Sequence, residues 1–399
     1  MNIAFFVDTY EPQINGVVTV VKQLKLDLER LGCTVYVITP RRANSKPLPC
    51  VFYLDARPSQ IGKNEYIPTV KYQIIVDFCR DHHIDILHAH SEFRIARLAI
   101  KAARELHLPF VITFHTFWKH YIKAYVPLWF LVPKSTVDMY TKYVYKNAVA
   151  IYAVSKKVQS YLSSKKMLPD KNIILIENAI DRAAVCNQES AEESKKNIAE
   201  IKSKYGITDD MMVLLYFGRV SHEKRIRELL KILNTVRVQT SKSIKLLILG
   251  GGPGMDDLSE YSKKLKLDDI VVFTGFIQRA HLIDYFKISK LFVSTSISET
   301  YSMTVTETLS AGLPVLLRED SCYFDRVING KNGIMAKTDK EFASALSDLI
   351  AHPEKLQALK ENCGSKKEEK PYTSLDQAKK YLDSYEEIVA NWNPDNSSR

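Results

Sequence analysis

The sequence predicts an α/β protein with two domains, each built on a parallel β-sheet. Short apolar, β-branched runs alternate with segments of helical periodicity, which is typical of βαβ units. The chain has 399 residues, enough for two or three domains of about 100–200 residues. The alternation pauses once, in a polar stretch within 181–204, and then restarts. We therefore expect an N-terminal domain at 1–183, a second domain at 184–372, and a C-terminal helix and tail at 373–399.

The first domain begins with a strand and a helix. Residues 3–7 (IAFFV) have the length and composition of a buried strand. Residues 17–31 then carry apolar side chains at helical spacing, and Gly32 follows where a left-handed cap would end the helix. Further apolar runs predict the remaining strands of this domain, at 34–39, 84–88, 110–114 and 150–154.

The second domain repeats the same pattern after the polar stretch, which we interpret as a linker whose later part is helical. Its predicted strands are the apolar runs at 212–217, 245–249, 270–274, 291–294 and 314–317. Residues 373–392 have the pattern of a helix, which either domain could bind, including by a return to the first domain.

Composition and charge narrow the class of protein. A hydrophobic fraction of 46% with 10% aromatic residues excludes a disordered or fibrous chain. The formal net charge is +10, and residues 1–185 carry all of the excess, with 25 Lys and Arg against 15 Asp and Glu. This asymmetry favours a polyanionic partner, namely a membrane surface, a nucleic acid or an anionic substrate.

The cysteines and the N-terminus favour a cytoplasmic protein. The six cysteines include no Cys-x-x-Cys pair, which fits a reduced protein better than a disulfide framework or a zinc site. The opening residues MNIAFFVDTY lack a basic region before the apolar run, so they indicate a strand and not a signal peptide. No apolar run reaches the roughly 18–20 residues of a membrane span.

Ligands of parallel sheets bind at the carboxyl ends of the strands, so we expect the site in a cleft between the two domains. The first strand-to-helix loop contains Asn15-Gly16, which brings a flexible backbone to a helix N-terminus. Free N–H groups there favour phosphate. An ordinary turn with a helix-capping Asn explains the same residues.

Two further loops carry glycines. In FGRVSHEK, Gly218 permits close backbone approach, while Arg219 and Lys224 could neutralise a diphosphate or could simply be solvated. The GGGPG loop at 250–254 is neither a dinucleotide fingerprint nor a phosphate-binding P-loop. It favours a turn that lets strand and helix pack closely, with nucleotide contact as a secondary reading.

The loop and helix at 294–314 hold two carboxylates with seven residues between them. Glu299 follows a strand, and Glu307 lies on a helix predicted to begin near Met303. A rise of about 1.5 Å per residue puts Glu307 roughly 6 Å along that helix. One carboxylate could reach sugar hydroxyls and the other a ribose diol, with helix N–H groups on the phosphates between them. This layout suits a sugar nucleotide.

Four segments in this order resemble the retaining glycosyltransferases of family 4, which have the GT-B fold. They are PQINGVV, FGRVSHEK, the GFI stretch at 275–277 and SETYSMTVTETLSAGLPV, and the similarity extends to NGKNG near residue 333. DILHAHSEF and TFHTFWKHYI are similar, more loosely, to the diacylglycerol glycosyltransferase branch.

The resemblance implies roles for matching residues. Gly16 would meet the donor diphosphate, while Arg219 and Lys224 would bind its phosphates and stabilise the leaving group. His115 would lie near the transferred sugar. The remaining matched residues would contact the base, the ribose or the donor sugar, and they are Ile277, Glu299, Thr300, Ser302, Met303 and Glu307.

The resemblance also implies transfer with retention of configuration, a sugar-nucleotide donor such as a UDP-hexose, and no metal or other cofactor. The front-face route of the family, with the leaving diphosphate assisting the acceptor hydroxyl, is expected. The chain departs from the family at Tyr301-Ser302, where a glycine-containing stretch is usual, and at Ala179, which replaces a glycine. Because of the first departure, the resemblance does not fix the identity of the donor sugar. Because of the second, it does not fix the conformation of the hinge turn.

His88 and His90 (HAH) end a strand at alternate positions and therefore share a face. A zinc site would need a third ligand, so loop or acceptor-site roles are favoured.

Residues 117–146 combine nine aromatic side chains with five lysines and one acid, Asp138. Aromatic rings and lysines of this kind favour the headgroup layer of an anionic membrane. Packing of the rings in a core is the alternative, and stacking on a single-stranded nucleic acid is disfavoured because no other module supports it.

We therefore expect a glycosyltransferase that binds peripherally to the inner face of the cell membrane and glycosylates diacylglycerol or a glycosyl-diacylglycerol. One alternative is a glycosyltransferase that acts on a polysaccharide, teichoic acid or protein. Another is a catalytically silent subunit that only binds a partner. The oligomeric state is left open.

Overall fold

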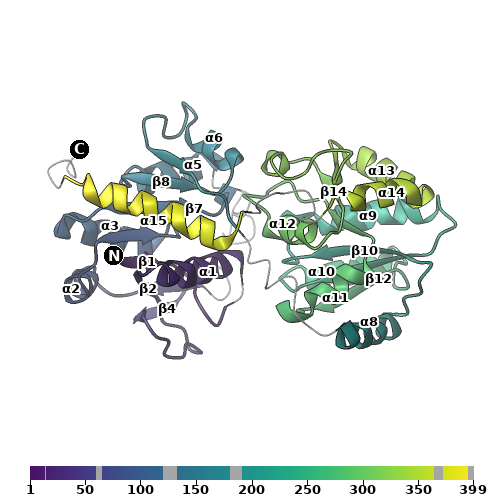
Figure 1. Ribbon diagram of the computed structural model, residues 1–399, viewed down its shortest axis with the longest axis horizontal. Helices are drawn as coiled ribbons and strands as arrows, with labels where there is room; N and C mark the ends of the chain where they lie inside the picture. The colour runs from purple at the N-terminus through teal and green to yellow at the C-terminus, as the bar shows by residue number, and fades with distance from the viewer. Residues whose placement is uncertain (14, 60–64, 120–132, 180–190, 364–371, 394–399) are drawn as a thin grey trace. The chain divides into compact units, whose positions relative to one another are not determined.

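The structure is a computed structural model that describes residues 1–13, 15–59, 65–119, 133–179, 191–363 and 372–393. It divides into two compact units, one of Met1–Ala179 with Tyr372–Arg399 and the other of Ile180–Pro371. The predicted boundary after residue 183 and the start of the predicted linker fall outside the described residues. The predicted α/β class, with two Rossmann-like parallel sheets, is confirmed (Figure 1).

Unit 1 contains a seven-stranded parallel sheet in the order β3-β2-β1-β6-β7-β8-β9. Its strands are β1 (Asn2–Phe6), β2 (Thr34–Pro40), β3 (Val51–Leu54), β6 (Ile86–Ala89), β7 (Phe110–Phe114), β8 (Ala150–Ala153) and β9 (Ile173–Leu175). The strands β4 (Ala56–Pro58) and β5 (Tyr66–Pro68) form a separate antiparallel ribbon. The helices are α1 (Gly16–Arg30), α2 (Gln73–Asp81), α3 (Arg94–Leu106), α5 (Lys134–Tyr145), α6 (Lys156–Leu162) and α15 (Ser374–Ala390).

Unit 2 contains a six-stranded parallel sheet in the order β12-β11-β10-β13-β14-β15. Its strands are β10 (Met212–Phe217), β11 (Ile244–Leu249), β12 (Val271–Gly275), β13 (Leu291–Ser294), β14 (Val315–Arg318) and β15 (Gly333–Ala336). Its α-helices are α8 (Ala191–Tyr205), α9 (Ile226–Arg237), α10 (Met255–Lys264), α11 (Leu282–Ile288), α12 (Met303–Ser310), α13 (Asp339–Ala351) and α14 (Pro353–Glu361). Three short 3-10 helices are η2 (His222–Lys224), η3 (Arg279–His281) and η4 (Ser321–Tyr323).

The helices of unit 2 form two layers because its strands are apolar on both faces. One face packs with α9, α10, α13 and α14 around Leu214, Leu246 and Phe342. The other face packs with α8, α11 and α12 around Leu215, Phe292 and Val305.

Helix α1 begins and ends where the sequence indicates. The Asn15 side-chain oxygen accepts a hydrogen bond from the Val18 backbone N–H at 2.9 Å, so Asn15 is the N-cap. Gly32 follows the helix with φ +89°, the left-handed conformation expected of a glycine after a C-terminus.

Helix α15 returns to unit 1 and packs beside α1 (Figure 1). A capping box between Thr373 and Asp376 starts the helix. Its side chains Ala378, Tyr381 and Tyr385 are fully or nearly fully buried in the same core cluster as strands β1 and β2. The last helix of the chain is therefore part of the core of the first unit.

We predict that Tyr385→Phe destabilises unit 1 by about 1–3 kcal/mol, because the buried His88 Nδ1 would lose its partner. The Tyr385 hydroxyl lies 2.6 Å from that nitrogen. Urea unfolding followed by tryptophan fluorescence reports this unit, since Trp118, Trp129 and Trp392 all belong to it.

Tyr381→Phe is the matched control on the same helix. The Tyr381 hydroxyl lies 3.4 Å from Thr113 Oγ1, which keeps a 2.7 Å contact with His88 Nε2. We expect it to cost about 1 kcal/mol or less, so equal losses in the two variants would contradict the prediction.

Candidate functional site

The strand order of unit 2 reverses between two neighbouring strands. From β10 the chain proceeds outward to β11 and β12, and it then returns to β13 on the other side of β10. The loops that leave the carboxyl ends of β10 and β13 therefore run to opposite faces, which opens a crevice between them. These two loops hold Arg219, Lys224 and Glu299.

Three contacts tie the two loops together. The Lys224 Nζ lies 2.7 Å from Glu299 Oε1, and the two side chains are only 17% and 12% exposed. The Ser298 hydroxyl donates to the Glu223 carbonyl at 3.2 Å, and the Thr295 hydroxyl donates to the Arg225 carbonyl at 2.7 Å. The structure thus brings together the predicted phosphate-binding cation and the predicted sugar-binding carboxylate.

The GGGPG loop supports this arrangement by close backbone packing. A Cβ on Gly250 would lie 2.0 Å from the Gly218 carbonyl oxygen, and one on Gly252 would lie 2.3 Å from that of Val220. GGGPG is thus a packing turn, but the close contacts of Gly250 and Gly252 are with the backbone of the loop after β10 and not, as predicted, between a strand and a helix. The backbone of the loop after β10 therefore packs directly against Gly250 and Gly252, where a side chain larger than that of glycine would clash.

Gly218 and Arg219 occupy the start of the same loop. A Cβ on Gly218 would lie 3.8 Å from Thr304 Cγ2, so this glycine lies beside the first turn of α12. The Tyr216 hydroxyl donates to the Arg219 carbonyl at 3.0 Å, and Arg219 itself is exposed.

Glu307 lies on α12 with its side chain only 6% exposed. It forms an ion pair with Arg279 of η3. Burial raises the pKa of Glu307, and the adjacent guanidinium opposes that rise. Sequence reasoning missed Arg279, although it lies two residues beyond Ile277 of the GFI stretch.

The other predicted donor contacts lie on the same edge of unit 2. Ile277 and Met303 are partly buried against the core cluster that contains Phe292. Thr300 is half-buried, and Ser302 is the N-cap residue of α12 with φ +65°.

The corresponding reversal of strand order in unit 1 lies between β1 and β6. Unit 1 carries the other two predicted site residues. Gly16 is the exposed first residue of α1. His115 directly follows β7, and burial lowers its pKa to about 4. Its Nε2 lies 3.0 Å from His90 Nδ1, and the His90 ring lies 4.0 Å from that of His88. The prediction that His88 and His90 share a face is confirmed.

His88 is a core residue and not a loop residue. It is fully buried and bonds to Tyr385 and Thr113 through its two ring nitrogens. Among the described residues, no group of three or more His, Cys, Asp or Glu side chains is placed to hold a metal ion.

Two carboxyls that sequence reasoning missed follow β1 and β6, at the reversal of the sheet, and Asp8 is half-buried while Glu92 is buried. Burial, with repulsion from Glu92 and Glu65, raises the pKa of Asp8 to about 7, and burial raises the pKa of Glu92 to about 7. Glu92 accepts hydrogen bonds from Tyr145 at 2.6 Å and from Trp118 at 2.8 Å. The sequence signal that could have found them is an acid in the loop after a strand, the criterion already applied to Glu299.

The predicted membrane segment at 117–146 is described at 117–119 and 133–146, and residues 120–132 lie outside the described residues. Part of it is core, since Phe117 and Tyr145 are buried. Lys119 pairs with Asp138 at 3.0 Å. Met139 and Tyr143 of α5 are 64% and 56% exposed, with Lys146 also exposed. In the part of the chain that the structure describes, no helix is long and apolar enough to cross a bilayer.

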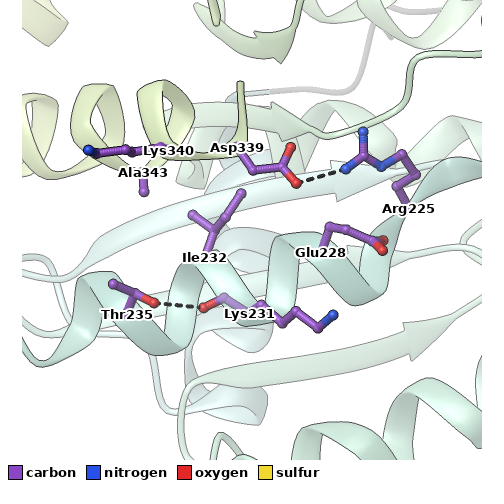
Figure 2. Close-up of a pocket in the computed structure, with 8 residues that line it drawn as sticks. All are labelled: Arg225, Glu228, Lys231, Ile232, Thr235, Asp339, Lys340 and Ala343. Atoms are coloured by element: carbon purple, nitrogen blue, oxygen red, sulfur yellow. Dashed lines mark hydrogen bonds and ion pairs between the residues drawn. The ribbon is translucent and has the colours of Figure 1, made fainter. Parts of the chain in front are cut away.

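A shallow surface pocket of about 490 Å³ lies elsewhere on unit 2, between α9 and α13 (Figure 2). Arg225 borders it and pairs with Asp339 at 2.7 Å, so the residue after Lys224 is anchored to α13. The Lys231 side chain lines the pocket. None of the predicted site residues lines it, and we assign it no ligand.

We predict that Asp8→Asn makes unit 1 more stable than the wild type as the pH rises. In the folded protein the Asp8 carboxyl stays protonated up to about pH 7, whereas in the unfolded chain it ionises near pH 4. The stability that the protonated carboxyl gives the folded state is therefore lost as the pH rises between these two values. The difference in melting temperature should grow by about 3–6 °C between pH 5 and pH 8, as followed by tryptophan fluorescence. Asp77→Asn removes a carboxyl that is 61% exposed and serves as control. A pH-independent difference for Asp8→Asn would contradict the prediction.

Comparison with known proteins agrees with this geometry. Residues 14–184 match Glycosyltransferase Family 4, and residues 197–366 match Glycosyl transferases group 1. The alpha-monoglucosyldiacylglycerol synthase of Streptococcus pneumoniae is 30% identical over 89% of this chain and 79% of its own length. The synthase of the same name from Acholeplasma laidlawii is 28% identical over 91% of each chain.

Solved structures show the same fold. Anabaena HepE in complex with UDP and glucose matches with a TM-score of 0.73 at 16% identity, over 97% of this chain and 100% of that one. The sucrose-phosphate synthase from Thermosynechococcus elongatus matches with a TM-score of 0.73 at 17% identity, over 98% and 99%. The two parallel-sheet units, the two family matches and the shared length with these relatives together establish that the chain is a glycosyltransferase of family 4, group 1, with the GT-B fold.

Proposed function

We propose that the protein transfers a hexose from a UDP-sugar to a hydroxyl of a membrane lipid, diacylglycerol or a glycosyl-diacylglycerol, with retention of configuration. The observation that carries this proposal is the pair Lys224–Glu299, which joins the two loops at the strand reversal of unit 2. The names of the two synthases similar to this chain, and the UDP and glucose in the HepE complex, support the acceptor and donor classes.

In this proposal, unit 2 holds the donor by charge. Arg219 and Lys224 neutralise the diphosphate and stabilise the negative charge that develops as the glycosidic bond breaks. Glu299 accepts hydrogen bonds from sugar hydroxyls, and its ion pair orients the Lys224 ammonium beforehand. Glu307 binds the ribose diol, and Arg279 favours its ionised, hydrogen-bond-accepting form.

Unit 1 supplies His115 and the acceptor side of the reaction. Since burial lowers the pKa of His115 to about 4, the ring is neutral at pH 7 and acts by hydrogen bonding. The leaving diphosphate oxygen takes the proton of the acceptor hydroxyl as the new bond to the anomeric carbon forms on the face that the diphosphate leaves. No metal takes part, so turnover should persist in a chelator.

The experiment is a panel of sugar nucleotides supplied with vesicles of diacylglycerol or glucosyl-diacylglycerol, with products identified by mass and by the anomeric coupling constant. A lipid α-hexoside from an α-linked donor supports the proposal. Transfer only to teichoic acid, polysaccharide or protein would reassign the acceptor. Absence of both transfer and donor hydrolysis would indicate a catalytically silent subunit.

We predict that Arg219→Ala and Lys224→Ala each lower kcat by about 10²–10³-fold, because each removes a charge that stabilises the leaving group. Arg219→Ala should unfold at a temperature close to that of the wild type, because the side chain is exposed. Lys224→Ala should fold but melt at a lower temperature, because it removes the ion pair with Glu299. Lys231→Ala is the matched control, since it removes a cation from the same unit in the pocket of Figure 2. Near-normal turnover of either site variant would contradict the assignment of the donor site.

We also propose that α5 docks on the inner face of an anionic cell membrane, which would bring the enzyme to its lipid acceptor. Met139 and Tyr143 offer apolar and aromatic surface, Lys142 lies on the same helix, and Lys146 is its C-cap residue. Lysines near an anionic surface contribute about 1 kcal/mol each. Lys119 is unsuited to this role because it pairs with Asp138 and lies over the Tyr161 ring.

We predict that the double substitution Lys142→Gln/Lys146→Gln weakens binding to phosphatidylglycerol vesicles by about tenfold or more at low salt. Sedimentation across a salt series measures it, because screening should abolish the difference at high salt. Lys195→Gln/Lys196→Gln removes two exposed charges from α8 of unit 2 and should bind as the wild type does. Equal losses in the two variants, or binding that salt does not alter, would refute docking through α5.

A further inference from the structure

The residue that begins α12 has a backbone conformation that glycine usually supplies. Ser302 has φ +65° and ψ 78°, and it is only 9% exposed. Its side chain caps no helix N–H and instead lies 3.2 Å from the Thr304 hydroxyl. Because L residues with a Cβ rarely adopt this region, another group must hold the turn.

Arg326 provides that hold through four hydrogen bonds. Its Nη1 donates to the Ser302 carbonyl at 3.3 Å and to the Thr306 hydroxyl at 2.6 Å. Its Nη2 donates to the Tyr301 carbonyl and, at 2.6 Å, to the Cys322 carbonyl. One planar guanidinium thus binds the residue before the turn, the turn itself and the first turn of the helix that follows.

The side chain of Tyr301 completes the contact. It is 6% exposed, and the Arg326 guanidinium carbon lies 3.8 Å from the centroid of its ring. Stacking of this kind requires the flat, delocalised cation of arginine, which a lysine cannot reproduce together with four hydrogen bonds.

We propose that Arg326 is a positioning residue of the donor site. By holding Ser302 in the left-handed conformation, it fixes where α12 starts and therefore how Glu307 on the helix stands relative to Glu299 on the loop. The proposal rests on the proposed function, in which both carboxylates bind one sugar nucleotide. It also assigns the Tyr301 ring to Arg326 and not to the donor sugar.

The test compares Arg326→Met in two backgrounds, the wild type and Ser302→Gly. Glycine adopts a positive φ without support, so the substitution should make Arg326 dispensable. We expect Arg326→Met to raise KM for the UDP-hexose, and the Kd for UDP, about tenfold in the wild-type background and less than about threefold in the Ser302→Gly background. Arg326→Lys should behave like Arg326→Met in the wild-type background.

Arg318→Met is the matched control, because Arg318 binds Asp339 and the Ala336 carbonyl and does not contact Ser302. Its effect should be the same in both backgrounds. If Arg326→Met does not fold, Tyr301→Leu in the same two backgrounds replaces it.

Equal rises of KM and Kd in the two backgrounds, or no rise in either, would overturn the role of Arg326. Calorimetry with UDP separates this result from a failure of the proposed function. A wild-type protein that binds no UDP overturns the donor site itself, whereas a wild-type protein that binds UDP leaves the comparison of backgrounds to decide on Arg326.

Discussion

The reversal of strand order in each parallel sheet is the constraint on which the rest of the structure depends. In unit 2 the reversal lies between β10 and β13, and in unit 1 it lies between β1 and β6. Loops on the two sides of a reversal lead to helices on opposite faces, so their first residues are left facing a crevice that no helix fills. Lys224, Glu299, Asp8 and Glu92 each lie in the segment that follows one of these four strands.

Much of this was accessible from the sequence because the signals are local. Apolar runs of five or six residues predicted β1 and β10, and Gly32 predicted the end of α1. Short strands such as β9 and β15 were missed, because runs of only three or four residues leave no clear pattern. The candidate site residues of unit 2 were predicted by motif and by position after strands, but the contacts that Arg279 and Arg326 make with this region were not predicted.

The contacts of Arg279 and Arg326 could not be predicted because each joins residues that are far apart in the sequence. Arg279 is 28 residues from Glu307, and Arg326 is 24 residues from Ser302. Each pairing depends on how two loops meet at the edge of a sheet, and neither has a characteristic spacing along the chain. The same holds for His88, whose partner Tyr385 lies 297 residues away on a helix that the sequence allowed to pack on either domain.

Two residues beside the proposed donor contacts of unit 2 have unusual backbone conformations that contacts from other segments hold in place. Arg225 and Ser302 both have left-handed backbones although neither is a glycine, and each adjoins a proposed donor contact, Lys224 or Met303. Such conformations persist only where surrounding contacts outweigh their cost. At Arg225 the carbonyl accepts from Thr295 and the guanidinium pairs with Asp339. At Ser302 the carbonyl accepts a hydrogen bond from the Arg326 guanidinium. The two turns are thus fixed from outside the loops that contain them. In the proposed donor site, this would hold Lys224 and Glu307 in place before a donor binds, so residues that do not touch the donor would still contribute to its binding.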